Sequence, residues 1–264
     1  MPTPPARPLA LVTGASSGIG RSYARRLAGL GYGLIAVGRR QDRLEALRAE
    51  LSAVSVRAVA ADLGTDAGIE AVAGICAGEP LDMLVNNAGV SHYMAFADLP
   101  SDKLAELLHV KVVAPTTLAR AAVPGMIGRG RGTVVNVAGM LAFGADAPIG
   151  AAPGRAVYVA TLAHLVALTE ALAVELGPKG LRVQALCPGI VATEFHERQN
   201  MDLSALPRMS AEDVVTASLA GLELGEVICA PGVERRDLLD TARGANLAAF
   251  GGQSPSLAAR YRAG

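Results

Sequence analysis

The sequence predicts an α/β fold, in which a doubly wound parallel sheet of about seven strands carries helices on both faces. Short apolar runs alternate with longer stretches of helical period along most of the 264 residues, a pattern typical of repeated βαβ units. A cluster of glycine and serine separates the first apolar run from the first helical stretch. Hydrophobic residues make up 51% of the chain, which suits strands that are buried on both faces.

Length and composition favour a single cytoplasmic domain over residues 1–264. Lys and Arg number 24, as do Asp and Glu, so the net charge gives no reason to expect nucleic acid or a membrane as a partner. The first apolar run, residues 9–12, is too short for a signal-peptide core or a membrane span. Cys76, Cys187 and Cys229 are odd in number and far apart, which favours reduced thiols. No cluster has metal-ligand spacing, so no metal is predicted.

The first half of the chain is expected to contain three βα units and a fourth strand. Its strands are short apolar runs, and we expect them at 9–13, 33–37, 54–60 and 82–86. Its helices have apolar residues at helical spacing among charged ones, and we expect them at 19–30, 42–51 and 65–77. Strands joined by such helical crossovers are parallel, so these elements predict a parallel sheet.

The second half continues the alternation but has two irregular segments. Its expected elements are a long helix ended by a Gly/Arg cluster, a strand, a second helix and two further strands, at 101–127, 133–137, 158–176, 181–186 and 225–229. The segment 142–157 is rich in Gly, Ala and Pro and is predicted to be a long loop. The tail, 231–264, has a weak helical stretch at 235–247. We expect it to pack on the domain or on a neighbouring subunit, and the sequence leaves both open.

A glycine-rich turn, Thr-Gly-Ala-Ser-Ser-Gly-Ile-Gly at 13–20, lies where the first strand passes into the first helix. Gly14 permits a tight turn, Gly18 lets the backbone approach a pyrophosphate, and Gly20 lets the helix pack close to the strand. The helix N-terminus offers free N–H groups and partial positive charge to an anion. A plain structural turn is the alternative, but the strand before it and the helix after it favour a dinucleotide site.

The end of the second strand indicates which nucleotide is bound. Sites for NAD usually carry Asp or Glu there, which binds the ribose 2′-hydroxyl. Here the strand leads into Arg39 and Arg40, with no carboxylate before Asp42. An Arg side chain suits a phosphate dianion, so we expect NADP(H) rather than NAD(H). The alternative for Arg40 is that it only ends the strand and is solvated.

Several motifs, in this order along the chain, resemble the short-chain dehydrogenase/reductase family, whose members have a Rossmann-type fold and bind a nicotinamide cofactor. Besides the turn at 13–20 they are Asp-Leu at 62–63, Asn-Asn-Ala-Gly at 86–89, Val-Asn-Val at 135–137 and Pro-Gly-Ile-Val-Ala-Thr at 188–193. Together with the two arginines, the resemblance implies these cofactor-binding residues: Gly14, Ser16, Ser17, Gly18, Ile19, Gly20, Arg39, Arg40, Asp62, Leu63, Asn87, Ala88, Gly89, Pro188, Gly189, Val191 and Thr193.

The resemblance also implies a catalytic centre, and the sequence departs from the family there. Members use an Asn in the long helix after the fourth strand, a Ser after the fifth strand, and a Tyr followed four residues later by a Lys. Tyr158 is present, but Leu162 stands where the Lys belongs and Gly139 where the Ser belongs. Lys111 stands where the Asn belongs.

A Tyr without its Lys is a poor base but an adequate acid. A free Tyr has a pKa near 10, so only about one molecule in a thousand is ionised at pH 7. Alcohol oxidation needs the phenolate, whereas ketone reduction needs a neutral phenol, so we expect reduction to survive these substitutions better. Lys111 lies in a mostly apolar helical run, and our hypothesis is that it partly substitutes for the missing Lys. The alternative is that it extends to solvent or to a subunit interface.

The sequence therefore predicts an NADP(H)-dependent reductase of a small carbonyl compound, with Tyr158 as the acid and Lys111 in support. A cofactor-binding pseudoenzyme and a non-redox enzyme on the same fold are the alternatives. One of Ser91, His92 and Tyr93 is a candidate donor to the substrate oxygen, unless all three only line the cleft. By analogy with the family, we expect a homodimer or homotetramer.

Overall fold

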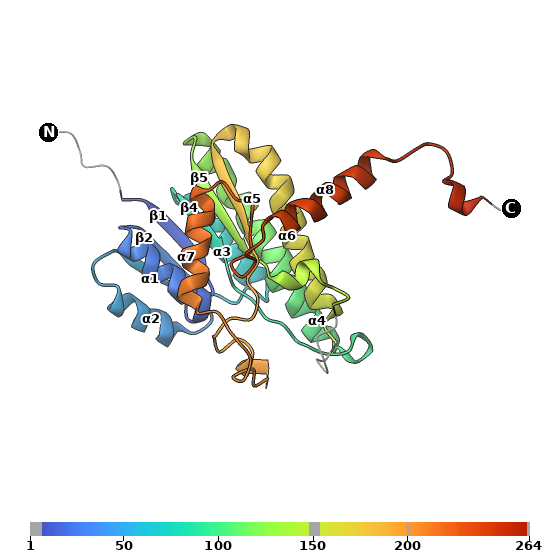
Figure 1. Ribbon diagram of the computed structural model, residues 1–264. Coiled ribbons are helices and arrows are strands. Elements are labelled where there is room, and N and C mark those ends of the chain that lie inside the picture. Colours follow the sequence, from blue (N-terminus) through green and yellow to red (C-terminus); the bar gives the residue numbers. More distant parts are fainter. Residues whose placement is uncertain (1–6, 148–153, 200, 263–264) are drawn as a thin grey trace. The chain divides into compact units, whose positions relative to one another are not determined.

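The computed structural model describes residues 7–147, 154–199 and 201–262. Its centre is a seven-stranded parallel sheet of order β3-β2-β1-β4-β5-β6-β7 (Figure 1). The strands are β1 (Leu9–Thr13), β2 (Gly33–Gly38), β3 (Val56–Ala60), β4 (Met83–Asn86), β5 (Gly132–Val137), β6 (Leu181–Leu186) and β7 (Ile228–Cys229). The chain winds outward from β1 in both directions, so the predicted doubly wound, Rossmann-type sheet is confirmed.

Helices cover both faces of this sheet (Figure 1). They are α1 (Gly18–Gly29), α2 (Gln41–Glu50), α3 (Asp66–Gly78), α4 (Ser101–Leu108), α5 (Ala114–Gly128), α6 (Ala156–Leu176) and α7 (Ala211–Glu223). One core cluster joins Tyr23 of α1 and Val214 of α7 to the sheet. A second cluster joins Val72 of α3 and Leu118 of α5 to it. Both faces of the inner strands β1, β2, β4, β5 and β6 are therefore largely buried, as their continuous apolar runs predict, whereas the edge strand β3 is partly exposed.

The strand register brings the functional segments to one edge of the sheet. Thr13 at the end of β1 pairs with Val37 of β2, and Asn86 at the end of β4 pairs with Asn136 of β5. Because all strands are parallel, the segments that follow them emerge at the same edge. The winding reverses between β1 and β4, which is where a crevice forms in such sheets.

The long helix expected at 101–127 is interrupted. α4 passes into a π-helical turn, His109–Val113, before α5 begins. Pro115 has no N–H to donate to the carbonyl of Lys111, so the regular ladder of helical hydrogen bonds cannot continue through this point. Such π turns are frequent at functional sites, and this one carries Lys111.

The sequence pattern did not predict α7, because its Ala, Gly and Ser residues dilute the helical period. The signal that marks it is a capping pair at its start. The Ser210 hydroxyl accepts the N–H of Asp213 at 3.0 Å and donates to the Asp213 carboxylate at 2.7 Å. The strand expected near 225–229 is shorter than predicted and covers only Ile228–Cys229.

The two irregular segments are described in part. Of the predicted loop at 142–157, residues 148–153 lie outside the described residues, and α6 begins at Ala156. By its internal contacts the chain divides into two compact units, 1–231 and 232–264. The second unit contains α8 (Asp237–Gly251) and a 3₁₀ turn at Ala259–Tyr261, so the helix expected at 235–247 is present but begins and ends later. The packing of the tail stays a prediction.

The segment Ala156–Lys179, which includes α6, is long and apolar enough to cross a membrane by length and composition alone. Core helices of globular domains pass the same test. In this fold Tyr158, Leu162 and Leu165 of α6 are buried in one core cluster with Ala185 of β6. Packing inside the domain therefore accounts for the apolar residues on the buried side of this helix.

Candidate active site

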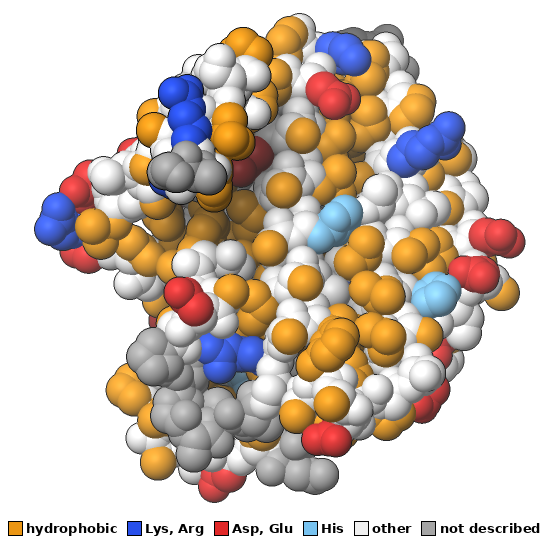
Figure 2. Space-filling model, turned by 90° about the vertical axis from the view of Figure 1, so that its right-hand side faces the viewer, with side chains coloured by type: hydrophobic (Ala, Val, Ile, Leu, Met, Phe, Trp, Pro, Cys, Tyr) orange, Lys and Arg blue, Asp and Glu red, His pale blue; other side chains and the backbone are white. Residues whose placement is uncertain are grey.

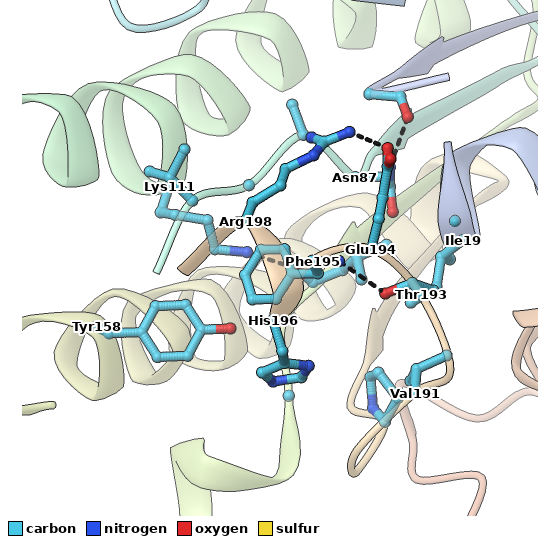
Figure 3. Close-up of a pocket in the computed structure, with 18 of the residues that line it drawn as sticks. Ile19, Asn87, Lys111, Tyr158, Val191, Thr193, Glu194, Phe195, His196 and Arg198 are labelled. Carbon is cyan, nitrogen blue, oxygen red and sulfur yellow. Dashed lines mark hydrogen bonds and ion pairs between the residues drawn. The ribbon is translucent and has the colours of Figure 1, made fainter. Parts of the chain in front are cut away.

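One cavity of about 1040 Å³ brings together motifs that lie far apart along the chain. It is lined by every residue expected to bind the cofactor except Gly20, and also by Tyr158 and Lys111 (Figure 3). Tyr93, one of the three candidate donors, also lines it. Further lining residues were not among the expected set, namely Met140, Leu141, Glu194, Phe195, His196 and Arg198. The segments expected to bind a cofactor and the segment expected to carry the catalytic Tyr thus share one cleft.

The glycine-rich turn forms a backbone cradle at one end of this cavity. Gly14 and Gly18 have φ values of +66° and +52°, in the left-handed region that favours glycine. A Cβ on Gly18 would lie 3.0 Å from the methyl carbon of Thr193, so a side chain would fill the cradle. Gly20 faces inward instead, because a Cβ there would lie 2.3 Å from the carbonyl oxygen of Gly14. With α1 beginning at Gly18, this cradle fits a pyrophosphate.

Thr13 and Asn87 fasten the turn to the segment after β4. The Asn87 side-chain amide donates to the carbonyl oxygens of Thr13, at 2.9 Å, and Gly14, at 3.4 Å. The Thr13 hydroxyl oxygen accepts the N–H groups of Asn87 and Ala88 at 2.9 and 3.0 Å. Asn87 therefore holds the cradle in shape while it also lines the cavity.

Asp62 and Leu63 line the cavity beyond β3, where the resemblance places the adenine. The Asp62 carboxylate accepts the N–H of Gly64 at 2.9 Å, and its carbonyl accepts the hydroxyl of Thr65 at 2.9 Å. Thr65 in turn caps α3 by accepting the N–H of Gly68 at 3.1 Å. These bonds fix the turn that presents Asp62 and Leu63.

The two arginines after β2, Arg39 and Arg40, differ in their contacts and in their exposure to solvent. Arg40 donates to the hydroxyls of Ser16 and Ser17 at 3.1 Å each, so its guanidinium is held at the glycine-rich turn and does not merely end the strand in solvent. Arg39 is about half exposed and pairs with Glu106 at 3.2 Å, although it also lines the cavity. Of the two, Arg40 is the guanidinium fixed beside the phosphate cradle.

Tyr158 is buried on α6, and its hydroxyl points into the cavity (Figure 3). Burial raises the pKa of Tyr158 well above its ordinary value, and the neighbouring Tyr93 raises this pKa further. The phenol of Tyr158 is therefore protonated at neutral pH. This is the state required of a proton donor, not of a base.

Lys111 is buried and directed into the cleft rather than to solvent. Its Nζ donates to the carbonyl oxygen of Val137 at 3.0 Å, and its side chain passes close to Gly89, where a Cβ would lie 3.6 Å from Nζ. Burial lowers the pKa of Lys111 to about 8, and nearby Cys187 opposes this effect. The ammonium thus lies where β4 and β5 end, and Figure 3 shows it pointing toward the same part of the cavity as the Tyr158 hydroxyl.

Gly139 and Leu162, at the positions where the resemblance implies a Ser and a Lys, lie against each other. A Cβ on Gly139 would be 3.3 Å from Cδ1 of Leu162 and 3.7 Å from the carbonyl oxygen of Pro188. Leu162 is buried in the same cluster as Ala138 and Cys187. Together these residues make an apolar wall, and neither substituted position offers a side-chain hydrogen bond.

The three polar residues after the Asn-Asn-Ala-Gly motif separate in the structure. Ser91 is fully buried, and its hydroxyl finds no hydrogen-bond partner in the part of the chain that the structure describes. His92 binds Glu106 at 2.6 Å. Tyr93 faces the cavity, where its ring centroid lies 5.2 Å from that of Tyr158 and 6.2 Å from that of His196. Tyr93 is therefore the member of this trio that is placed to meet a substrate.

A buried polar network fixes the helix that carries Tyr158. The side-chain amide of Asn86 donates to the side-chain oxygen of Asn136 at 2.9 Å, and the Asn136 amide donates to the hydroxyl of Thr169 on α6 at 2.9 Å. Asn86 also donates to the carbonyl oxygen of Pro115 on α5 at 3.2 Å. The pair thus ties β4 and β5 to both helices that flank the site.

A grouping of three or more His, Cys, Asp or Glu side chains suited to hold a metal ion does not occur among residues 7–147, 154–199 and 201–262. The expectation that the site works without a metal stays a prediction.

Comparison with known proteins identifies the family of this chain. Residues 8–204 match the family model for short chain dehydrogenases, which is most of the chain and the whole of the cavity lining before Leu206. The chain belongs to the short-chain dehydrogenase family. Membership makes it an oxidoreductase by family, as the motifs predicted.

Several relatives of this short-chain dehydrogenase are reductases or oxidoreductases by name. It is 34% identical over 193 residues to the very-long-chain 3-oxoacyl-CoA reductase of Pyrenophora tritici-repentis, a match that covers 70% of this chain and 55% of the relative. The chain thus spans little more than half the length of that fungal protein. An uncharacterized oxidoreductase of Myxococcus xanthus is 34% identical over 221 residues, with 82% of this chain and 84% of the relative covered.

Solved structures of the family superpose over nearly the whole chain. The short-chain dehydrogenase of Sphingobium yanoikuyae in complex with NADPH has a TM-score of 0.91 and 33% identity, covering 97% of this chain and 100% of that chain. The bulky-bulky ketone specific alcohol dehydrogenase of Comamonas testosteroni has a TM-score of 0.86 and 29% identity, covering 96% and 98%.

The segment after β6 contributes most of what the sequence analysis missed. Glu194, Phe195, His196 and Arg198 directly follow the last recognised motif, in a stretch without strong period. They line the cavity because the backbone of Ala192 and Met209 joins the two ends of this segment, with an N–H···O distance of 2.9 Å. A usable signal was the dense run of charged and aromatic residues immediately beyond Thr193.

Proposed function

We propose that this short-chain dehydrogenase is an NADP(H)-dependent enzyme that reduces a small carbonyl compound, with Tyr158 as the proton donor. The observation that carries this proposal is a buried, protonated phenol in the same cavity as the phosphate cradle. The cofactor would supply the hydride. Tyr158 would donate its proton to the carbonyl oxygen as negative charge develops there, which requires the phenol and not the phenolate.

Arg40 supports NADP(H) over NAD(H). Its guanidinium is already held by Ser16 and Ser17 beside the cradle, and such a group suits a 2′-phosphate. The Sphingobium yanoikuyae relative was solved with NADPH, and a relative from Beutenbergia cavernae was solved with NADP. NAD(H) remains the less favoured cofactor in this proposal.

Lys111 and Tyr93 would replace the lost Lys and Ser in part. With a pKa of about 8, Lys111 is mostly protonated at pH 7 and brings to the site a positive charge that Leu162 does not. The Tyr93 hydroxyl, beside Tyr158, is placed to hydrogen-bond the substrate oxygen in the way that a Ser would and Gly139 does not. Phe195 and His196 complete an aromatic lining that suits an apolar carbonyl compound.

A cofactor-binding pseudoenzyme is the second candidate, favoured by the apolar contact of Gly139 with Leu162 where the family carries polar groups. A non-redox enzyme that uses the same pocket is a third.

NADPH consumption with a panel of aldehydes and ketones separates these candidates, once NADPH binding has been measured by fluorescence. We expect reduction of at least one carbonyl, slowed by about a hundredfold or more in Tyr158→Phe while NADPH binding stays the same. Binding of NADPH without turnover of any carbonyl would refute the reductase. Failure to bind NADPH would refute the cofactor assignment itself.

We also propose a cytoplasmic homodimer or homotetramer. Figure 2 shows hydrophobic side chains spread across much of the face on the right-hand side of Figure 1, where α4, α5 and α6 lie. Leu108 and Val113 are about two-fifths exposed, and Val174 is 71% exposed. Apolar side chains in such positions suit a subunit interface. Light scattering of the purified chain gives the mass that tests this, and a monomer at all concentrations would refute it.

A further inference from the structure

The carboxylate of Glu194 lies at the meeting point of three arginines beside the phosphate cradle. It accepts from Arg40 at 2.9 Å and from Arg43 at 2.9 Å through each of its oxygens. It also accepts from Arg198, one helical turn further along the same segment (Figure 3). The cluster therefore holds three positive charges around one negative charge.

These arginines come from separate parts of the chain and converge on Glu194, and two of them, Arg40 and Arg198, also contact the glycine-rich turn. Arg40 and Arg43 lie at the start of α2, whereas Arg198 follows β6. Arg198 donates to the Ser17 hydroxyl at 3.3 Å, and the same hydroxyl accepts from Arg40 at 3.1 Å. Arg198 and Arg40 therefore both contact one hydroxyl of the cradle, and both also bind Glu194.

The cluster has an excess of positive charge that one carboxylate does not balance. Burial together with Arg40, Arg43 and Arg39 lowers the pKa of Arg198 to about 10, as expected for a guanidinium among like charges. The Glu194 side chain is only 29% exposed, so solvent screens these charges incompletely. A second anion, in particular a phosphate dianion, would balance this excess positive charge.

We propose that Glu194 competes with the 2′-phosphate of NADP(H) for Arg40, and that Arg198 binds this phosphate together with Arg40. This inference rests on the proposed NADP(H) dependence, and in it Glu194 and Arg198 would set how tightly NADP(H) binds. Arg40 has a fixed number of N–H donors, so a phosphate oxygen on the face now bound to Glu194 would have to displace the carboxylate. Glu194 and a dianion on the same guanidinium would also repel each other.

Two consequences distinguish this arrangement from a simple structural ion pair. Removing the Glu194 charge should strengthen binding of ligands with a 2′-phosphate and leave those without it unaffected. Removing the Arg198 charge should weaken the binding of the ligands that carry a 2′-phosphate and leave the binding of the others unaffected. If Glu194 only positioned Arg40, neutralising Glu194 would instead weaken the binding of ligands that carry a 2′-phosphate.

Calorimetric titration of the full chain with NADPH, NADH, 2′,5′-ADP and 5′-AMP tests the proposal without any need for turnover. In Glu194→Gln we expect the dissociation constants of NADPH and 2′,5′-ADP to fall about fivefold, and those of NADH and 5′-AMP to change less than about twofold. In Arg198→Met we expect the first two to rise about fivefold. Glu197→Gln, in the same turn, and Arg48→Met, on α2, are matched charge controls and should match the wild type within about twofold.

Each outcome of these titrations decides the proposal. The proposal is supported if Glu194→Gln binds NADPH and 2′,5′-ADP more tightly, Arg198→Met binds these two ligands more weakly, and the two control variants match the wild type. Equal shifts for NADPH and NADH, weaker NADPH binding in Glu194→Gln, or equal effects in the two controls overturn it while leaving NADP(H) dependence intact. If NADPH does not bind the wild type, both the proposed function and this inference fail.

Discussion

Gly139 and Leu162 fit each other: a Cβ on Gly139 would lie 3.3 Å from Cδ1 of Leu162. The two positions are 23 residues apart along the chain, and they are the positions where the resemblance implies a Ser and a Lys. The space that a Ser side chain would take at position 139 is thus bordered by Leu162. Gly139 and Leu162 are therefore matched in shape, and changing one of them alone should cost stability.

Gly139→Ser should lower the free energy of unfolding by about 1 kcal/mol, because its Cβ would press on Leu162. The backbone at Gly139 is extended, with φ of 166°, so the conformation itself accepts a Ser. Denaturant unfolding measures the change. Gly189→Ser is the control, since a Cβ at Gly189 meets no described atom within 4 Å. Equal losses in both variants would contradict the contact with Leu162 as the cause.

The double variant Gly139→Ser/Leu162→Lys should not gain reductase activity. A lysine at position 162 would bring a second ammonium into a buried site that already holds Lys111, and like charges in such a place repel. Steady-state NADPH consumption with the best carbonyl of the panel is the measurement. A clear gain of activity would instead identify the wild type as a weakened enzyme whose old site can be restored.

Lys111→Met should raise stability at pH 7 by about 1–3 kcal/mol, because it removes a buried charge. The pKa of Lys111 is lowered from 10.5 to about 8, so between these pH values the unfolded chain binds more protons than the folded chain. Wild-type stability should therefore rise with pH through this window, and its gap to the variant should close. Chemical unfolding at a series of pH values measures both curves, and a constant gap would contradict the buried ammonium.

The same Lys111→Met variant should lose reductase activity and bind NADPH less tightly, if Lys111 supports the site as proposed. A buried charge that lowers stability is expected at functional positions, where stability is exchanged for activity. Unchanged activity together with unchanged NADPH affinity would end the hypothesis that Lys111 replaces the missing Lys.

Tyr93→Phe should lower the pKa of Tyr158, although burial keeps it above the ordinary value. Tyr93, once it ionises at high pH, raises the pKa of Tyr158 by its negative charge, and its hydrogen bond with Tyr158 raises this pKa further; the variant removes both effects. Reduction needs a protonated Tyr158, so the alkaline limb of its pH profile should move to lower pH. NMR of ¹³C-labelled tyrosine follows the Tyr158 ionisation directly, and an unmoved titration would contradict the coupling.

Asn136→Ala should destabilise the fold by about 2–4 kcal/mol, because it leaves Asn86 and Thr169 without their buried partner. Thermal and denaturant unfolding give the size of the loss. Asn246→Ala, at an exposed position of α8, is the matched control and should change stability by less than about 0.5 kcal/mol. A similar loss of stability in Asn136→Ala and Asn246→Ala would show that the buried network adds nothing to stability beyond what an exposed Asn adds.

Local patterns predicted most of the fold and the cofactor end of the site. The observed bounds of β1 and β6 equal the expected ranges 9–13 and 181–186, because an apolar run between turn residues is a property of the local sequence. The left-handed backbone of Gly14 and Gly18 is likewise local, since glycine adopts it at little cost. Helix α7 escaped prediction because small residues gave it little helical period.

The sequence by itself determined the doubly wound sheet, the phosphate cradle and the retained Tyr158, since each depends on residue types over a few adjacent positions. Only the tertiary structure decided that Lys111 points inward and that Arg40, rather than Arg39, is held at the cradle. It alone brought Glu194 to Arg40, across 154 positions of the chain. Contacts of this kind depend on how strands and helices pack, and the period of a single segment does not encode which distant side chain it will meet.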